Sequence, residues 1–490
     1  MSFKRVATNA AAQILAKAGT AFISIFLVRI LTGYLGDAGF GAYSKVMNYS
    51  SIFAVLADVG LYAVTVREVA ARRADRAAVL RIVGTVTTLR CVLGLALTAV
   101  ALLGAWFLPG YGSPAMLAAV AVAMAFVLFG LLNSSLLSFL QAELKAEFSL
   151  VSTVAGKLAT FALVAALAWW WLPVPAGTFA GDAGLLGVLW ATLAGAVLMT
   201  GMLWWYARRI EPVGFAWDAP TAKSLLLQSL PYAASLFLAA VFLKVDIQVL
   251  SLYLPDDRVG HYAFSAKIVE VGMVFSTFVL NSLLPVMGAA HAAGDRPALA
   301  RAVRAGLGTL ALAGAALSAY CWAFAEPIAR LVAASSFLAG DGFDSVRVFH
   351  VTAWIFALYF VGAFFQFFLL AVRRQSTLLW ATSAAAAANL ALNFALIPSW
   401  GIFGAAWASV ASMAVYAVGL AALAGRVPGF AFPWKPVLAG AVLAGGFVLA
   451  WPLLAPYSAG LPAVAVLAAG GVFVGLPFGA AWWVTVRRAG

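Results

Sequence analysis

The hydrophobic and polar positions of the chain alternate on the scale of whole segments rather than of single residues. Apolar runs of about 20 residues or more, the length that a helix needs to cross the ~30 Å hydrocarbon layer, are separated by short stretches in which charges, Pro and Gly cluster. Strands of a membrane barrel need only about ten alternating residues each, so this pattern predicts helices. We predict fourteen membrane-spanning helices, near residues 10–32, 43–66, 82–108, 115–140, 150–172, 183–206, 224–253, 260–286, 305–325, 346–372, 378–397, 402–425, 437–455 and 462–485.

The composition supports an all-α polytopic membrane protein. Hydrophobic residues make up 65% and charged residues 10% of the 490 residues, against about 45–50% and about 25% in soluble domains. So few charges cannot cover a water-facing surface, which excludes a soluble globular protein, and the high hydrophobicity excludes disorder. The two cysteines, Cys91 and Cys321, lie in apolar runs, and the three histidines lie in different segments. We therefore expect no disulfide framework, no metal site and no cofactor.

The distribution of Lys and Arg predicts the orientation of the spans. Cytoplasmic loops of membrane proteins carry an excess of these residues. If the N-terminus lies inside, the cytoplasmic loops and termini hold twenty Lys and Arg, and the outer loops hold three, Arg258, Arg330 and Arg347. We therefore expect a multi-pass protein of the inner membrane with both termini in the cytoplasm. This asymmetry also accounts for most of the net charge of +13, so we expect no nucleic-acid partner.

A segment after the first span recurs in the middle of the chain. Residues 31–43 (LTGYLGDAGFGAY) match residues 250–262 (LSLYLPDDRVGHY) at six of thirteen positions. At nearly the same offset, residues 184–191 match residues 401–408 through two glycines, a Trp and an Ala. The paired spans are an even number apart, so the copies are parallel repeats, as in the halves of many transporters, with the cargo site expected between them. The predicted domains are a six-helix lobe at 1–215, a second six-helix lobe at 216–430 and two additional helices at 431–490.

Charged residues within the apolar runs are the candidates for a functional site. A charge in mid-bilayer costs about 2.5–3.5 kcal/mol on insertion scales, so such residues tend to face an interior cavity. The carboxylates near or within the spans are Asp58, Asp246 and Glu270. The basic residues that remain after the loops are counted are Lys17, Arg29, Lys45, Arg90, Lys157, Lys244 and Lys267.

Some of these charges also have a structural interpretation. Lys45 lies near the predicted outer interface, where we expect its side chain to snorkel to water. Arg29 lies a few residues from the outer end of the first span, and we expect it to have a structural or snorkelling role. Lys267 and Glu270 are three residues apart and can neutralise each other on one helix face. Lys244 and Asp246, two residues apart, cannot meet well within one helix.

Lys17 carries the strongest local signal for a site. It belongs to a stripe of polar residues on an otherwise apolar helix. Their directions around the helix axis lie within about 80° of one another. Arg90 and Lys157 lie at a similar depth in the third and fifth spans, so the three cations predict an anion-binding patch open to the cytoplasm. Lys244 and Lys267 lie nearer the outer side of the second half. The polar members of the stripe that we expect to line the cavity beside Lys17 are Gln13, Thr20 and Ser24.

The sign of the intramembrane charge indicates the class of cargo. Cations outnumber carboxylates, which disfavours a carrier of organic cations and favours a cargo with a phosphate or diphosphate head group, since Lys and Arg both bind phosphate. Asp58, Asp246 and Glu270 are candidates for proton or sodium coupling, because shielding from water raises the pKa of a carboxyl group. A role as simple counter-ions is the alternative.

Four segments, in order, resemble the polysaccharide flippases of the multidrug/oligosaccharidyl-lipid/polysaccharide exporter superfamily. The resemblance extends over nearly the whole chain. It is carried by residues 29–43 (RILTGYLGDAGFGAY), 58–70 (DVGLYAVTVREVA), 260–270 (GHYAFSAKIVE) and 389–409 (NLALNFALIPSWGIFGAAWAS).

The resemblance implies two six-helix bundles around a cavity that opens alternately to either side. It implies movement of undecaprenyl-diphosphate-linked oligosaccharides across the inner membrane for O-antigen, capsule or exopolysaccharide assembly. Lys267 and Glu270 match the basic and acidic places of the family motif that opens the eighth span. By analogy with the relative that flips the peptidoglycan precursor, the two C-terminal helices would contact the lipid tail.

The alternative functions are a drug or metabolite exporter, a flippase of the peptidoglycan precursor, and a membrane glycan polymerase or ligase. An enzyme of the last kind needs acid and base groups on a sizeable outer loop, and the longest predicted outer loop (about residues 326–345) has no His. No zinc-protease, serine-hydrolase or phosphate-loop motif is present either. We therefore expect a transporter and not an enzyme. Its expected partners are a lipid-linked anionic glycan and membrane lipid, the chain acting as a monomer, with contact to the glycan polymerase machinery left open.

Overall fold

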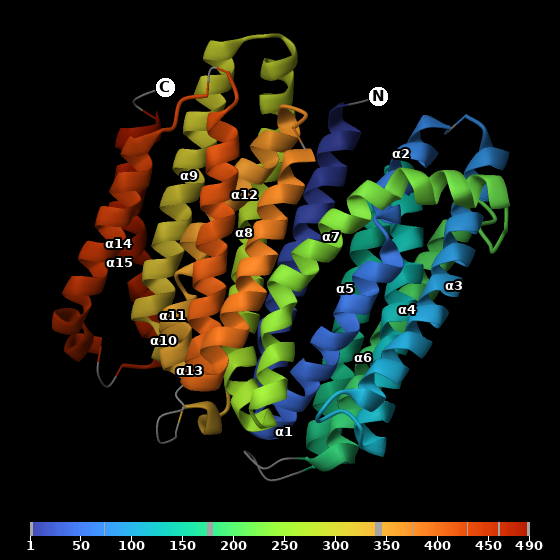
Figure 1. The fold of residues 1–490 in the computed structure, drawn as a ribbon, viewed down its shortest axis with the longest axis horizontal. Coiled ribbons are helices and arrows are strands. Elements are labelled where there is room, and N and C mark those ends of the chain that lie inside the picture. Colours follow the sequence, from blue (N-terminus) through green and yellow to red (C-terminus); the bar gives the residue numbers. More distant parts are fainter. Residues whose placement is uncertain are drawn as a thin grey trace. The chain divides into compact units, whose positions relative to one another are not determined.

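The computed structural model describes residues 3–72, 74–173, 180–338, 345–374, 376–428, 430–458 and 461–487. All regular secondary structure in these ranges is helical, which confirms the predicted all-α class (Figure 1). The chain divides into two compact units, Met1–Asp257 and Arg258–Gly490.

The described residues of the first unit form a bundle of seven α-helices, two of which are unusual. α1 is 56 residues long and bends within its length, and α5 continues into a short π-helical turn, η1. The start of α1 and the start of α3 lie at one end of this unit, and the α3–α4 connection lies at the other (Figure 1). The bounds are α1 (Phe3–Asp58), α2 (Leu61–Ala71), α3 (Arg76–Phe107), α4 (Pro114–Ala142), α5 (Ala146–Ala166), η1 (Leu167–Trp171), α6 (Gly181–Ile210) and α7 (Ala219–Tyr253).

The second unit contains the remaining helices. α8 starts at Asp256, two residues before the boundary between the units. The bounds are α8 (Asp256–Ala292), α9 (Arg296–Ala323), α10 (Ala325–Val332), η2 (Ser335–Phe337), α11 (Ser345–Thr352), α12 (Ile355–Ala371), α13 (Ser376–Gly425), α14 (Trp434–Leu454), η3 (Ala455–Ser458), α15 (Ala463–Trp482) and η4 (Trp483–Arg487).

The helices account for the fourteen predicted spans. Twelve continuous segments of the described chain are long and apolar enough to cross a membrane. Two of these are 50 residues long, more than twice what one crossing requires. Each contains a bend at a glycine, Gly36 in α1 and Gly401 in α13, whose positive φ of 66° and 55° breaks the helical path. If each of the two bent segments crosses the membrane twice, the described chain has the fourteen crossings that the sequence predicted.

The second predicted span, residues 43–66, is interrupted rather than continuous. α1 ends at Asp58, and α2 starts at Leu61 after Val59 and Gly60, which have positive φ of 47° and 71°. Hydrophobicity alone could not reveal this break, since Val59 is apolar and β-branched, a residue type that seldom adopts positive φ. As a result, Asp58 lies at a helix end and not in mid-helix.

The boundary between the two units falls after α7 and not before it. α7 packs on α1, α2 and α3, and so belongs to the first unit (Figure 1). The predicted boundary at 215/216, which came from the internal duplication, thus differs from the boundary at 257/258 that the packing shows. A duplication records where sequence repeats, whereas packing depends on which helix faces carry complementary side chains.

Among the described buried residues of the first unit, two apolar clusters are separate from each other. The outer cluster includes Val46, Tyr49, Ala101, Ala119 and Leu131, and the inner cluster includes Leu61, Val83, Leu136, Phe139 and Leu203. Both clusters draw on α1 or α2, α3, α4 and α6, so they lie one above the other along the same helices.

The C-terminal helices α14 and α15 pack on α9 within the second unit. Their shared core includes Leu312, Phe324, Ala444 and Phe478. Gly470 of α15 lies against the ring of Phe324, and a Cβ at this position would come within 2.2 Å of that ring. Residues 431–490 are therefore built into the second unit through close helix contacts.

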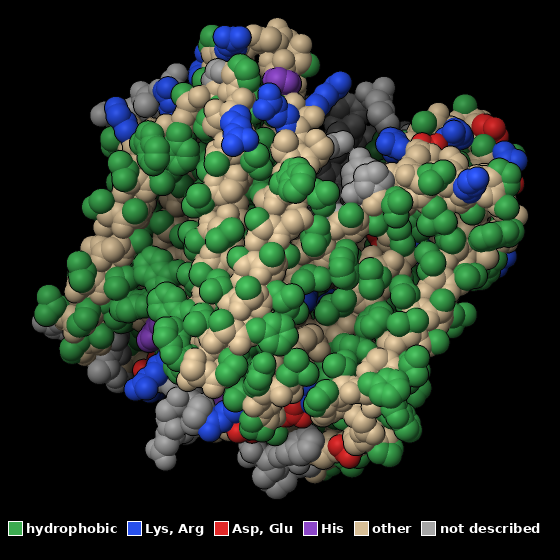
Figure 2. All heavy atoms as spheres, viewed as in Figure 1, with side chains coloured by type: hydrophobic (Ala, Val, Ile, Leu, Met, Phe, Trp, Pro, Cys, Tyr) green, Lys and Arg blue, Asp and Glu red, His purple; other side chains and the backbone are tan. Residues whose placement is uncertain are grey.

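Charged side chains are concentrated at the ends of the helices. In the first unit, Lys and Arg side chains gather around α2 and the start of α3, and hydrophobic side chains cover most of the visible length of the helices (Figure 2). In the second unit, Lys and Arg gather at the end that carries the α8–α9 connection (Figure 2). This separation is the one expected of helices that cross a hydrocarbon layer.

Candidate functional site

A layer of polar side chains lies between the two apolar clusters of the first unit. In α3 the inner cluster reaches Leu89 and the outer cluster resumes at Ala101, and in α4 the gap runs from Leu131 to Leu136. The side chains of this polar layer are Asp58 (α1), Arg90 (α3), Asn133, Ser134 and Ser135 (α4), and Thr200 (α6).

Arg90 is the centre of the polar layer. Its guanidinium group is completely buried, with 0% exposure. Nη1 donates to Ser135 Oγ at 2.9 Å, and Nη2 donates to Asp58 Oδ1. The Nε–H group has no hydrogen-bond partner among the described residues. A buried guanidinium needs a countercharge because it has lost its hydration, and Asp58 provides it.

Asp58 is the more accessible member of this ion pair. Its side chain is 22% exposed, and Oδ1 also lies 3.5 Å from Ser134 Oγ. Tyr62, the second residue of α2, lies within electrostatic range of Asp58 and Arg90 and donates to Gln141 Oε1. The ion pair therefore has one partly exposed member, Asp58, and one fully buried member, Arg90.

The backbone next to Asp58 is strained. Val59 has a φ of 47° and is followed by Gly60 at 71°. A β-branched residue at positive φ costs on the order of 1–3 kcal/mol, and such residues tend to occur at functional sites. The strain and the ion pair fall on adjacent residues, which makes the end of α1 the strongest candidate site that the described part of the first unit offers.

At Arg90 the described structure has an ion pair in place of the open anion-binding patch that the sequence predicted. The sequence placed Arg90 at the depth of Lys17 and Lys157 but did not reveal a partner for it. The carboxylate comes from α1, 32 residues earlier, and closes over the guanidinium. In this conformation Arg90 is held by Asp58, as the counter-ion interpretation of that carboxylate requires.

Lys157 and Lys17 lie on neighbouring helices. Lys157 is half-buried, and one residue before it Gly156 packs on Met199 of α6. The backbone of Gly19 in α1 approaches Val154 of α5, with 3.9 Å between the Cβ position of Gly19 and Val154 Cγ2. The side chains of Lys17 and Gln13 lie outside the described residues, so the structure places only their backbone, within α1.

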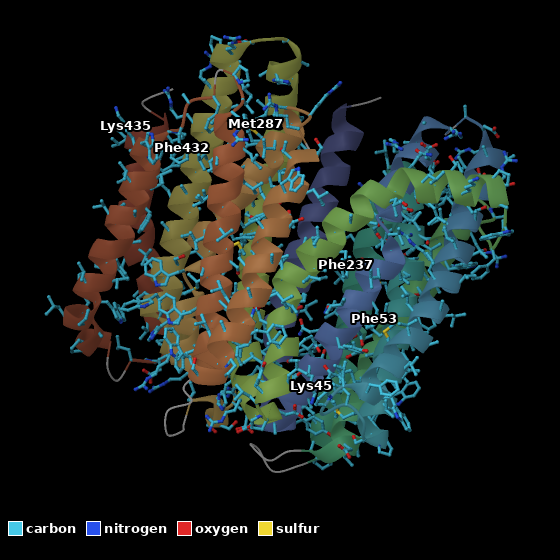
Figure 3. The ribbon with its side chains drawn as sticks, viewed as in Figure 1. Lys45, Phe53, Phe237, Met287, Phe432 and Lys435 are labelled. Carbon is cyan, nitrogen blue, oxygen red and sulfur yellow. The ribbon has the colours of Figure 1, made fainter. Side chains whose placement is uncertain are left out.

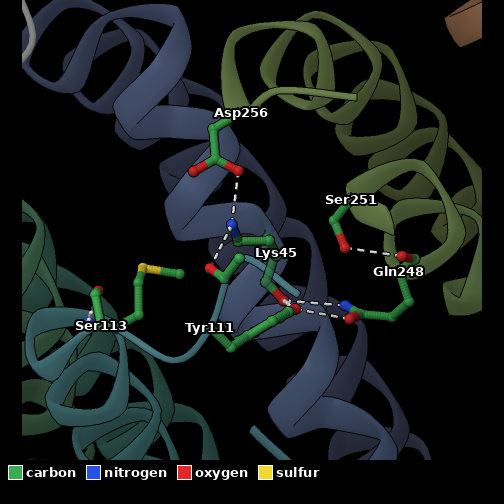
Figure 4. Close-up of polar contacts among 8 residues, drawn as sticks. Lys45, Tyr111, Ser113, Gln248, Ser251 and Asp256 are labelled. Carbon is green, nitrogen blue, oxygen red and sulfur yellow. Dashed lines mark hydrogen bonds and ion pairs between the residues drawn. The ribbon is translucent and has the colours of Figure 1, made fainter. Parts of the chain in front are cut away.

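A second polar cluster surrounds Lys45 near the other end of the first unit (Figures 3 and 4). Lys45 Nζ donates to Asp256 Oδ1 at 2.7 Å and to the carbonyl oxygen of Gly110 at 3.2 Å. It also lies 5.1 Å from the centre of the Tyr111 ring. The expectation that Lys45 snorkels to water is wrong, since this residue is 2% exposed and its charge is neutralised within the protein.

The main-chain carbonyl oxygen of Lys45 also accepts a hydrogen bond within this cluster. Tyr111 Oη donates to Gln248 Oε1 at 2.7 Å, and Gln248 Nε2 donates to the carbonyl oxygen of Lys45 at 3.0 Å (Figure 4). Burial raises the pKa of the Tyr111 hydroxyl well above its usual value, so this group stays protonated and donates. The cluster ties α1, the α3–α4 connection and the end of α7 together.

Sequence analysis did not identify the residues around Lys45 as a cluster. Asp256 was visible only as one matched position of the internal duplication, and Tyr111 and Gln248 carried no signal. Three segments far apart in sequence contribute, so only the fold brings them together.

The remaining predicted site residues have varied surroundings. Asp246 is 7% exposed, Lys244 is half-buried, and Ser24 Oγ donates to the main-chain oxygen of Thr20 at 2.8 Å. Lys267 Nζ donates to Glu270 Oε2 at 2.8 Å, and both side chains are well exposed, at 43% and 47%. The mutual neutralisation proposed for this pair is therefore present.

Within the described parts of the chain, no three His, Cys, Asp or Glu side chains are grouped so that they could hold a metal ion. The chemistry available in the polar layer is that of charge pairing and hydrogen bonding.

In a comparison with known proteins, two family models match this chain. A model of the family described as "Polysaccharide biosynthesis protein" matches residues 6–291, and a second model, MatE, matches residues 231–394. Among curated proteins, the chain is 26% identical over 214 residues to a "Probable multidrug resistance protein NorM" from Rhizobium meliloti (strain 1021). That match covers 40% of this chain and 44% of the relative, so it spans less than half of the relative's length.

Solved structures show the same fold. The "Lipid II flippase MurJ, inward closed conformation" has a TM-score of 0.75 and 13% identity, covering 98% of this chain and 100% of that one. An inward-facing multidrug resistance MATE family transporter of the MOP superfamily has a TM-score of 0.67 and 16% identity, covering 87% and 94%. The fold is thus that of the MOP-superfamily flippases and exporters, and since the first family model matches more than half of the residues, this chain belongs to the polysaccharide biosynthesis protein family.

Proposed function

We propose that this protein is a flippase that moves an undecaprenyl-diphosphate-linked oligosaccharide, a repeat unit of O-antigen, capsule or exopolysaccharide, across the inner membrane by alternating access. The observation that carries the proposal is the match of the polysaccharide biosynthesis family over residues 6–291. The likeness of the whole chain to the fold of a lipid II flippase agrees with a lipid-linked cargo. The cationic surplus in the spans suits an anionic diphosphate.

The residues proposed to bind the cargo are basic. Lys17 and Lys157, on the neighbouring helices α1 and α5, would attract the diphosphate, and Lys244 and Lys267 would act in the later spans. Arg90 would contribute after Asp58 releases it, since a guanidinium held by a carboxylate cannot at the same time bind phosphate bidentately. Gln13, Thr20 and Ser24 would line the path beside Lys17.

Asp58 is the strongest of the proposed ion-coupling residues. It is partly exposed and holds the buried Arg90, so that protonation or cation binding at Asp58 would weaken the ion pair. Asp246 and Glu270 are the other candidates, although Glu270 already pairs with Lys267.

The proposed setting follows from the charge distribution. The basic connections would face the cytoplasm, with both termini on that side of the inner membrane. The chain would act as a monomeric transporter without enzymatic activity, and α14 and α15 would contact the lipid tail of the cargo. Contact with the glycan polymerase machinery is an extension of this proposal.

The test is genetic and chemical. Deletion of the gene should abolish the surface glycan and leave its lipid-diphosphate precursor on the cytoplasmic side. The Lys17→Ala and Lys157→Gln variants should reduce surface glycan at normal protein level, whereas the exposed Lys223→Gln variant serves as a matched control and should not. A normal glycan in the deletion strain would refute the proposed function.

A multidrug exporter is the second candidate, favoured by the MatE match over residues 231–394 and by the NorM relative. It predicts that the deletion strain becomes sensitive to cationic dyes while its surface glycan is unchanged. The two outcomes are distinct, so the same strain decides between them.

A further inference from the structure

An exposed strip of aromatic rings and cations runs across α5 and α6, away from the polar layer. Arg209 Cζ lies 3.6 Å from the centre of the Trp205 ring, and the rings of Trp205 and Tyr206 are 4.8 Å apart. Tyr206 stacks on Phe148 at 4.4 Å with an interplanar angle of 9°. Lys145 Nζ lies 5.7 Å from the Phe148 ring. These five residues form a continuous cation–aromatic strip.

The strip lies where the helices leave the hydrocarbon. Lys145 is the residue before α5, and Arg209 lies in the last turn of α6, so the strip marks the ends of two membrane spans, Ala146–Trp171 and Gly181–Ile210. Trp205 is 49% exposed, and the next segment adds Phe215 at 61% and Trp217 at 58%. Amphipathic rings of this kind are enriched at the level of lipid headgroups.

The charge of the strip suits an anion. Lys145 and the two arginines, Arg208 and Arg209, are exposed, and Glu147, 3.8 Å from Lys145, is the carboxylate that reaches the strip among the described residues. A guanidinium placed over an indole ring still has N–H groups available for phosphate oxygens. Cations and rings are thus arranged so that a phosphate and an apolar chain can be bound side by side.

We infer that the cation–aromatic strip binds the headgroup of an anionic phospholipid, with phosphate on Arg209 and Lys145 and the glycerol region against Trp205. A lipid fits better than a second protein chain, because the strip combines an exposed ring with a net positive charge at the bilayer boundary, three cations against the one carboxylate of Glu147. The site is independent of the proposed cargo, since its charged and indole groups (Lys145, Trp205 and Arg209) are exposed and it uses none of the proposed cargo-binding residues.

The test uses the purified full-length protein in detergent, titrated with phosphatidylglycerol or phosphatidylcholine, with retained lipid measured by native mass spectrometry. A basic residue that contacts an anionic headgroup directly should strengthen its binding about fivefold. The Arg209→Gln/Lys145→Gln variant should therefore lose at least about fivefold in affinity for phosphatidylglycerol. An Arg296→Gln/Arg301→Gln variant removes the same charge from another exposed helix end and should bind like the wild type.

Two results would overturn the inference. One is an unchanged preference for phosphatidylglycerol in the Arg209→Gln/Lys145→Gln variant, and the other is an equal loss in the control variant, which would indicate a diffuse charge effect. If the double variant does not fold, Trp205→Leu removes the aromatic platform at constant charge. It should lower the affinity severalfold, and an unchanged affinity would also contradict the site.

Discussion

Lys45 Nζ and Asp256 Oδ1 lie 2.7 Å apart, although 211 residues separate them in sequence. The lysine side chain is 3% exposed and the aspartate side chain 35%. Asp256 is the first residue of α8, two residues before the second unit starts. The ion pair therefore anchors the connection between α7 and α8 to α1.

Asp256→Asn should destabilise the protein because it leaves the Lys45 charge buried without a countercharge. Breaking a fully buried pair costs about 3–5 kcal/mol, and the partial exposure of Asp256 lowers this figure. Thermal unfolding in detergent, followed by size-exclusion chromatography, should show a clearly lower midpoint. Lys45→Met combined with Asp256→Asn should recover part of the loss.

The matched control for this ion pair is Glu326→Gln, which breaks the exposed pair of Arg330 and Glu326. Exposed pairs contribute about 0–1 kcal/mol, so little change is expected. If Asp256→Asn unfolds at the wild-type temperature, the Lys45 cluster does not anchor this connection.

Arg90 and Asp58 can be separated into structural and transport roles by a double substitution. Arg90→Met alone leaves a carboxylate without its countercharge, and Asp58→Leu alone leaves a fully buried cation, so each should destabilise by up to about 3–5 kcal/mol. The double variant replaces the pair with apolar groups and should recover stability. Protein level and surface glycan are both measured.

The two readouts distinguish the roles of this pair. We expect the double variant to be present at a normal level and to lack surface glycan, because transport under the proposed function needs Arg90. Normal surface glycan in the double variant would show that Arg90 and Asp58 have a structural role and are not needed for transport.

Val59→Gly should relieve backbone strain at the end of α1. Val59 has a φ of 47°, and positive φ costs a β-branched residue on the order of 1–3 kcal/mol, which outweighs the ~0.5–1 kcal/mol entropic cost of glycine. The unfolding midpoint should stay equal or rise. Val66→Gly, in the regular part of α2, should lower the free energy of unfolding by a few tenths of a kcal/mol through helix propensity and further through loss of its half-buried side chain. Equal losses in both variants would show that Val59 is unstrained.

Gly36→Ala should destabilise the bend in α1. Its φ of 66° and ψ of −173° lie in a region that is essentially restricted to glycine, so a Cβ costs on the order of 1–3 kcal/mol. Gly33→Ala is the matched control, since a Cβ there meets no atom within 4 Å. It should be neutral or stabilising by up to about 1 kcal/mol. Equal unfolding midpoints for the two variants would show that the backbone conformation at position 36 does not require glycine.

The candidate site could be anticipated only in part. Asp58, Arg90 and Lys157 stood out as charges in apolar runs, because burial of a charge is costly wherever the chain folds. The pairing of Arg90 with Asp58 did not follow from their spacing, since the two residues are 32 positions apart on different helices and only the packing of α1 on α3 brings them together. The Lys45 cluster was not predicted for a similar reason, since its members come from three segments far apart in sequence.

The sequence by itself determined the class of fold, the number of spans and the separation of basic from apolar segments. These properties depend on the transfer of side chains between water and hydrocarbon, which is nearly additive along the chain. Tertiary structure decided which charges neutralise each other, where the helices bend and break, and to which unit α7 belongs. Those outcomes depend on contacts within a few ångströms between distant segments, and no single segment contains them.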